Sequence, residues 1–105
     1  MAFIQVMTTT GTKEQAREIA RCLVEEKLAA CVQILDGMES TYLWKGKIET
    51  SGEFMCFIKT RDDLYPQVEE AIKKIHSYET PEIIALLITR GSKDYLQWLD
   101  ESLIT

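Results

Sequence analysis

Apolar residues recur along the chain with two spacings, one typical of strands and one typical of helices. Four short apolar runs, some rich in β-branched residues, predict strands at residues 2–7, 29–35, 54–58 and 83–89. Apolar residues at helical spacing predict three helices, which begin near Thr12, Asp62 and Ser92. Thr12 and Gln15 also form a capping-box pattern at the start of the first helix.

A β-hairpin is predicted in the middle of the chain. Residues 41–44 and 47–50 carry aromatic and β-branched side chains, and Gly46 between them can supply the positive φ of a tight turn. Asp36-Gly37 is expected to end the strand before the hairpin. The order predicts an α+β, ferredoxin-like βαββαβ sandwich with an extra C-terminal helix, as one domain over residues 1–105.

The strand predicted at 54–58 is apolar on both of its alternating faces. In this fold both helices cover one face of the sheet, so the other face would be left in water. Either Met55 with Phe57, or Phe54 with Cys56 and Ile58, must point to that uncovered face. The exposed apolar patch predicts a homo-oligomer with closed cyclic symmetry.

Composition narrows the range of partners. The chain has 105 residues, of which 46% are hydrophobic, and its 12 basic and 17 acidic residues give a net charge of −5. Its dispersed positive charges argue against nucleic acid, and cations are better partners. The first residues lack the pattern of a signal peptide, and no apolar run approaches the roughly 18 residues of a membrane span. A soluble cytoplasmic protein is therefore expected. The three cysteines are expected to be free thiols, with Cys22 open to oxidation.

His76 is the only histidine, and it stands in a polar segment with Glu79 and Glu82. Its imidazole could ligate a transition metal or act as a general base. The commoner role for a histidine at this place is that of a cation at a helix C-terminus. One histidine cannot fill a metal shell, so cysteine or carboxylate ligands, or the same histidine from neighbouring subunits, would have to complete it.

Three other residues are candidates for chemistry or contact. The Cys31 thiolate suits Cu(I) or zinc, although a free cysteine is more often a small buried hydrophobe. Trp44 and Tyr42 lie on one face of a hairpin arm and favour a subunit interface over a ligand wall. Lys59 ends an apolar strand and is either a partner for an anion or a solvated strand end. The chain has no phosphate loop, catalytic-triad order or paired-cysteine motif.

Five segments in the right order match one known family: residues 26–32, 42–47, 59–60, 76–86 and 94–99. Through them, residues 4–103 resemble the CutA divalent cation tolerance proteins. The resemblance implies a ferredoxin-like homotrimer with a link to copper and other divalent cations. It also implies that Cys31 and His76 are candidate metal ligands. Trp44, Lys59 and Tyr78 match further family positions and are other cleft or interface candidates.

One residue departs from the family pattern. Ser77 follows the histidine where the family typically has proline, so a less rigid loop is expected.

Three functions follow, in order of preference. The first is a non-enzymatic, copper-binding trimer involved in metal tolerance. The alternative is a trimeric scaffold or signalling protein that resembles the PII proteins and binds a small molecule or a partner protein at its subunit clefts. An enzyme with His76 as base and Tyr78 or Lys59 as acid ranks last, because no activated nucleophile or cofactor motif supports it.

Overall fold

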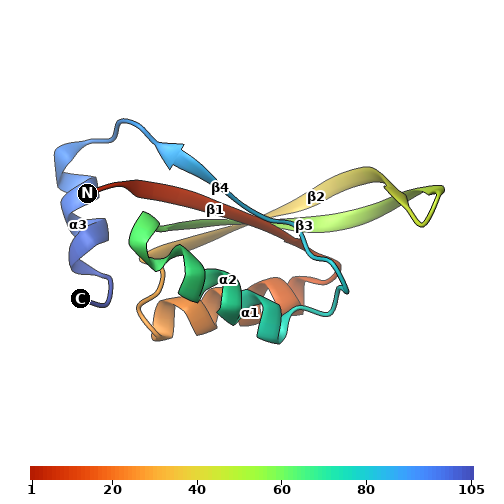
Figure 1. The fold of residues 1–105 in the computed structure, drawn as a ribbon, viewed down its shortest axis with the longest axis horizontal. Helices are drawn as coiled ribbons and strands as arrows, with labels where there is room; N and C mark the ends of the chain where they lie inside the picture. The colour runs from red at the N-terminus through yellow and green to blue at the C-terminus, as the bar shows by residue number, and fades with distance from the viewer.

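Four antiparallel strands and three α-helices make up the computed structural model, which describes residues 1–105. The elements are β1 (Phe3–Thr10), α1 (Lys13–Glu25), β2 (Cys31–Trp44), β3 (Lys47–Arg61), a short 3-10 helix η1 (Asp62–Leu64), α2 (Tyr65–Ile75), β4 (Ile83–Ile88) and α3 (Lys93–Glu101). The strand order is β2-β3-β1-β4, and α1 and α2 lie side by side against one face of the sheet (Figure 1). This confirms the predicted α+β sandwich with an extra C-terminal helix.

The central strands are longer than the sequence predicts. Residues 29–35 and 41–44 were expected as separate strands, but β2 runs without a break from Cys31 to Trp44. In the same way, β3 joins residues 47–50 to residues 54–58. The resulting hairpin extends beyond the body of the molecule, which therefore measures 44 × 25 × 22 Å (Figure 1).

A β-bulge explains why Asp36-Gly37 does not end the strand. The pairing passes from Leu35 opposite Met55 to Met38 opposite Glu53, so two residues of β2 face one residue of β3. Gly37 has a φ of +77°, which a residue with a Cβ adopts only with strain. The turn at Lys45-Gly46 is confirmed, and both of its residues have positive φ.

The core lies between the sheet and the helix pair. Its fully buried side chains include Val6 and Ile58 from the sheet and Ile19, Leu23 and Ile72 from the helices. Cys56 is on this face too, and Met55 and Phe57 therefore lie on the opposite one.

We call the face away from α1 and α2 the open face. By the strand register it carries Leu35, Ile84 and Leu86, which are 56%, 47% and 52% exposed. The predicted apolar patch is therefore present, but β2 and β4 carry its exposed residues, because Met55 of β3 is only 8% exposed and Phe57 is half-buried.

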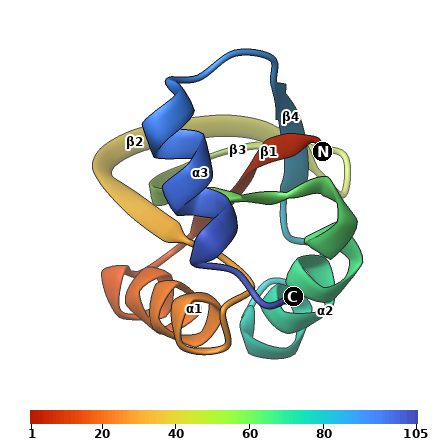
Figure 2. The same ribbon diagram turned by 90° about the vertical axis from the view of Figure 1, so that its left-hand side faces the viewer.

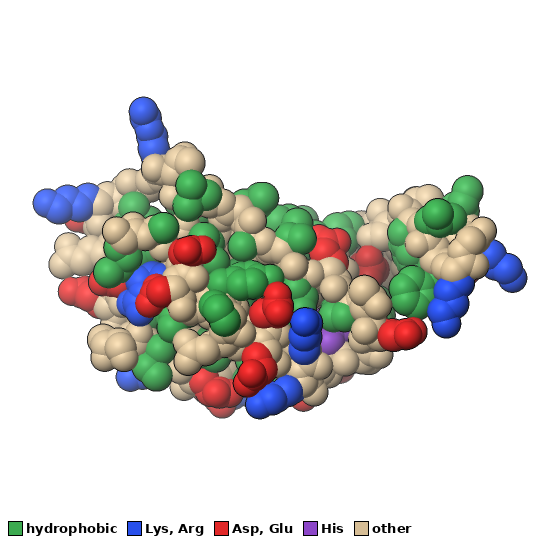
Figure 3. Space-filling view, in the orientation of Figure 1, with side chains coloured by type: hydrophobic (Ala, Val, Ile, Leu, Met, Phe, Trp, Pro, Cys, Tyr) green, Lys and Arg blue, Asp and Glu red, His purple; other side chains and the backbone are tan.

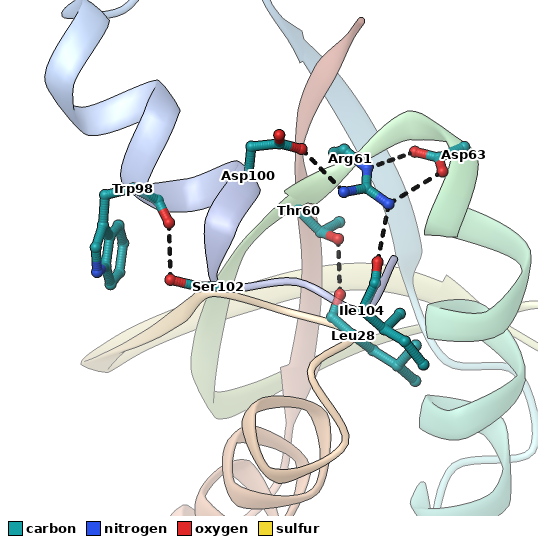
Figure 4. Close-up of polar contacts among 8 residues, drawn as sticks. All are labelled: Leu28, Thr60, Arg61, Asp63, Trp98, Asp100, Ser102 and Ile104. Atoms are coloured by element: carbon teal, nitrogen blue, oxygen red, sulfur yellow. Dashed lines mark hydrogen bonds and ion pairs between the residues drawn. The ribbon is translucent and has the colours of Figure 1, made fainter.

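The third helix lies across the end of the sheet where β3 finishes (Figure 2). The Arg61 guanidinium, at the end of β3, donates to Asp63 and Asp100 at 2.9 Å each. It also donates to the Ile104 carbonyl oxygen at 3.0 Å (Figure 4). Leu99 of α3 is fully buried in the core. One buried arginine thus joins α3 and the C-terminal residues to the sheet. No helix is long and apolar enough to cross a membrane.

Candidate functional site

His76 caps the C-terminus of α2, but its side chain turns toward the sheet. The residue is 9% exposed, and its Nε2 lies 2.7 Å from the Thr9 carbonyl oxygen at the end of β1. The backbone N–H of Tyr78 donates to Nδ1 at 3.1 Å. Since a backbone N–H can only donate, Nδ1 carries no proton and Nε2–H donates to Thr9. Both ring nitrogens are in hydrogen bonds, so the His76 side chain is held between β1 and its own loop and is not free at the helix end.

Tyr78 crosses the end of β1 and reaches a carboxylate on β3. Its hydroxyl donates to Glu53 Oε2 at 2.8 Å. Burial, followed by the hydrogen bond and the charge of Glu53, raises the pKa of Tyr78 to about 12. A Cβ at Gly11 would stand 3.1 Å from this hydroxyl, so the glycine allows the close crossing. Tyr78 therefore keeps its proton at neutral pH and fixes the Glu53 carboxylate.

Gln15 holds the 76–82 segment against α1. The Thr12 hydroxyl accepts from the Gln15 backbone N–H at 3.2 Å, which confirms half of the capping box. The other half is missing, because the Gln15 side chain instead donates to the Ile75 carbonyl oxygen. Its Oε1 accepts from the Ser77 backbone N–H and hydroxyl at 3.3 and 3.1 Å. Proline could make neither of these bonds, so Ser77 ties the loop down by a different route.

A cleft of about 800 Å³ lies between this segment and the β2–β3 hairpin. We call it the acidic cleft because four glutamates and no basic residue line it. Its lining residues are Thr9, Ser40, Thr41, Tyr42, Trp44, Glu49, Glu53, Ser77, Tyr78, Glu79, Thr80 and Glu82. Five residues singled out from the sequence thus come together here: Tyr42, Trp44, Tyr78, Glu79 and Glu82.

Cys31 and Lys59 lie elsewhere, as direct partners across β2 and β3. The Lys59 ammonium donates to Gln33 Oε1 at 2.6 Å. Cys31 is a half-buried free thiol. Burial, followed by the charge of Cys31, raises the pKa of Tyr95 in α3. This region is at the α3 end of the sheet, away from the acidic cleft.

The two predicted metal ligands are far apart within one chain. Gln5 of β1 lies in the row of Lys59 and Cys31, whereas Thr9 of β1 binds His76. Four residues at about 3.3 Å each separate the two rows by roughly 13 Å. No group of three or more His, Cys, Asp or Glu side chains converges anywhere in the chain. One chain alone therefore offers no multidentate metal centre.

The other two thiols are poor candidates for redox chemistry. The Cys22 thiol donates to Glu26 Oε2 at 3.1 Å, and burial followed by this bond raises the pKa of Cys22 to about 11. Burial raises the pKa of Cys56 to about 11 as well. Because the thiolate is the reactive form, Cys22 is protected rather than open to oxidation.

Sequence reasoning missed Glu53 and Gln15. Glu53 did carry a signal, because it precedes Met55 and Phe57 at a spacing of two and so falls in an apolar row of the strand. A carboxylate in such a row indicates either a bulge or a polar partner. Gln15 carried no separate signal, since its capping-box position already explained it.

The fold and sequence match known proteins closely. The family model described as CutA1 divalent ion tolerance protein matches residues 4–102. The divalent-cation tolerance protein CutA of Thermus thermophilus is 43% identical over 97 residues, which cover 92% of this chain and 94% of that protein. The chloroplastic protein CutA of Arabidopsis thaliana is 44% identical over 94% of this chain, which spans 54% of that longer relative.

Solved structures agree. The structure of CutA1 from Oryza sativa superposes with a TM-score of 0.96 at 42% identity and covers 99% of this chain and 95% of that one. A divalent cation tolerance protein from Thermus thermophilus gives a TM-score of 0.94, also at 42% identity, over 96% of this chain and 98% of that one.

A structure from Archaeoglobus fulgidus, described as a periplasmic divalent cation tolerance protein, matches with a TM-score of 0.93 at 42% identity, over 95% of this chain and 97% of that one. The relatives thus carry both chloroplastic and periplasmic descriptions, and the cytoplasmic location stays a prediction. With a family match over nearly its whole length, the chain belongs to the CutA1 divalent ion tolerance family.

Proposed function

We propose that the protein is a non-enzymatic homotrimer that binds divalent cations, copper above all, as cargo. The family match over residues 4–102 is the observation that carries this proposal. Copper heads the affinity order for nitrogen and sulfur ligands, and the chain provides both in Cys31 and His76.

Cys31 is the better placed of the two ligands. Its thiol is half-buried and free, and its register with Lys59 puts it on the open face. His76 would have to give up its bond to Thr9 or to Tyr78 before a ring nitrogen could reach a metal ion. Copper binding at His76 therefore costs a structural hydrogen bond, whereas binding at Cys31 does not.

An assembly would supply what one chain lacks. Because no three metal-ligating side chains converge in the chain, a multidentate centre needs ligands from neighbouring subunits. Leu35, Ile84 and Leu86 on the open face give apolar area that such subunits would cover. The non-enzymatic role is supported by the same site, since the His76 nitrogens and the Tyr78 hydroxyl are all engaged in structural bonds.

Copper titrations of single variants test the proposal. We expect Cys31→Ser to lose bound copper, as measured by metal analysis after equilibrium dialysis, while the matched control Cys22→Ser keeps it. His76→Gln retains a donor for Thr9 but offers a much poorer copper ligand, and it tests the imidazole in the same way. An unchanged copper count in both Cys31→Ser and His76→Gln would contradict the proposed ligands.

A further inference from the structure

The acidic cleft holds charge that the chain does not neutralise. Its carboxylates belong to Glu49, Glu53, Glu79 and Glu82. The chain has six ion pairs, and none of them uses any of these four residues. Acidic side chains gather beside the hollow where the hairpin leaves the body (Figure 3). A cation in the cleft would meet negative charge with no internal competitor in contact with it.

Glu53 gives this unneutralised negative charge a specific position in the cleft. The residue is 7% exposed, and the only hydrogen bond to its carboxylate comes from Tyr78 to Oε2. Its Oε1 has no hydrogen-bond partner within the chain and is not fully buried, so it is open to the cleft that Glu53 lines. A nearly buried carboxylate is costly unless a cation or several donors compensate its lost hydration. An ammonium group in the cleft would replace water as the partner of this oxygen.

Aromatic rings form part of the same wall. Tyr42, Trp44 and Tyr78 line the cleft together with the glutamates. The Lys45 ammonium lies 5.6 Å from the centroid of the Trp44 ring, so one face of this ring already accepts an ammonium within the chain. Aromatic faces beside carboxylates are suited to organic cations, whose methylene groups pack on the rings.

The spacing of the carboxylates distinguishes an extended cation from a metal ion. A metal ion needs several ligands around one point, and no three such side chains converge here. A chain of separated ammonium groups can instead meet the carboxylates one at a time. The volume of about 800 Å³ is that of a small-molecule site rather than of an ion site.

We propose that the acidic cleft binds a linear aliphatic polyamine, with one ammonium group on Glu53 and others on the outer glutamates. This ligand goes beyond the copper proposal, because neither Cys31 nor His76 lines the cleft. The bound polyamine would bridge the 76–82 segment and the hairpin without any covalent step.

Tryptophan fluorescence gives a direct test on the full chain. The protein has two tryptophans, so a Trp98→Phe background leaves Trp44 as the only reporter. We expect spermidine, titrated in metal-free buffer at fixed ionic strength, to give a saturable change in Trp44 emission. Glu53→Gln keeps an acceptor for Tyr78 and should weaken spermidine binding about tenfold or more, because a charge-assisted bond is lost.

Control variants distinguish a specific binding site from general attraction of spermidine to an acidic protein. Glu18→Gln removes the same charge at an exposed position outside the cleft and should change spermidine affinity less than about twofold. Glu49→Gln, at the cleft, should weaken binding even if Glu53→Gln fails to fold. Equal affinity of the two cleft variants and wild type, or equal weakening by Glu18→Gln, would overturn the proposal. Copper binding by Glu53→Gln should remain unchanged in either case.

Discussion

At the scale of single residues, the one histidine has a structural role. His76 looks like a surface ligand in the sequence, yet its two ring nitrogens join the end of β1 to the backbone at Tyr78. Tyr78 in turn holds Glu53 at the edge of the acidic cleft. His76 therefore shapes the cleft by fixing its neighbours, even though it does not line it.

Replacing His76 tests this structural role. His76→Ala leaves the Thr9 carbonyl oxygen and the Tyr78 N–H without partners and opens a small cavity, so we expect the free energy of unfolding to fall by about 2–4 kcal/mol. His76→Gln can restore the bond to Thr9 and should lose less. Guanidinium chloride unfolding of the two variants measures both values. A loss of less than about 0.5 kcal/mol in His76→Ala would mean that the two bonds contribute nothing.

At the level of elements, the helices were predictable and the long strands were not. Helical spacing located all three helices, because each carries one apolar stripe. The second α-helix begins at Tyr65 and not at Asp62, since Asp62–Leu64 form a 3-10 helix. Asp36-Gly37 has the composition of a turn, but strand pairing on both sides absorbs it as a bulge. Local composition cannot show this, since the pairing partners Met55 and Glu53 are far away in the sequence.

The candidate site was likewise predictable only in part, because its contacts join residues that are far apart in the sequence. His76, Tyr78 and Trp44 were singled out from their types and surroundings, and the last two do line one cleft. Their contact with Glu53 depends on the folded end of β1 at Gly11, which brings Tyr78 over to β3. The family resemblance implies Cys31 and His76 as candidate metal ligands, but the strand register puts them at separate rows.

The ion pair between Arg61 and Asp63 should make the stability of the protein depend on pH. The pKa of Asp63 lies below its ordinary value of 3.8, and the hydrogen bond from Arg61 is the largest cause. This stabilisation is therefore complete above pH 3.8 and is lost as the pH falls through the lower folded value. We expect Arg61→Met to lower the free energy of unfolding at pH 7 by about 1–3 kcal/mol. The difference from wild type should narrow below pH 3.8 in denaturant titrations, and a difference that stays constant with pH would contradict this role.

At the scale of the whole molecule, two surfaces are suited to binding partners. The open face exposes apolar side chains that are typical of a subunit interface, as the doubly apolar strand at residues 54–58 predicts. The acidic cleft on the hairpin side lacks basic residues and suits a cation. A net charge of −5 agrees with cationic ligands at either place.

Native mass spectrometry with and without stoichiometric Cu(II) tests the central proposal most directly, because one spectrum reports subunit number and metal count together. We predict a trimer that takes up a fixed number of copper ions, the same in every preparation. A monomer at micromolar concentration would contradict the role given to the open face. A trimer that ignores copper would contradict the cargo proposed for this family member, while leaving its fold and family unchanged.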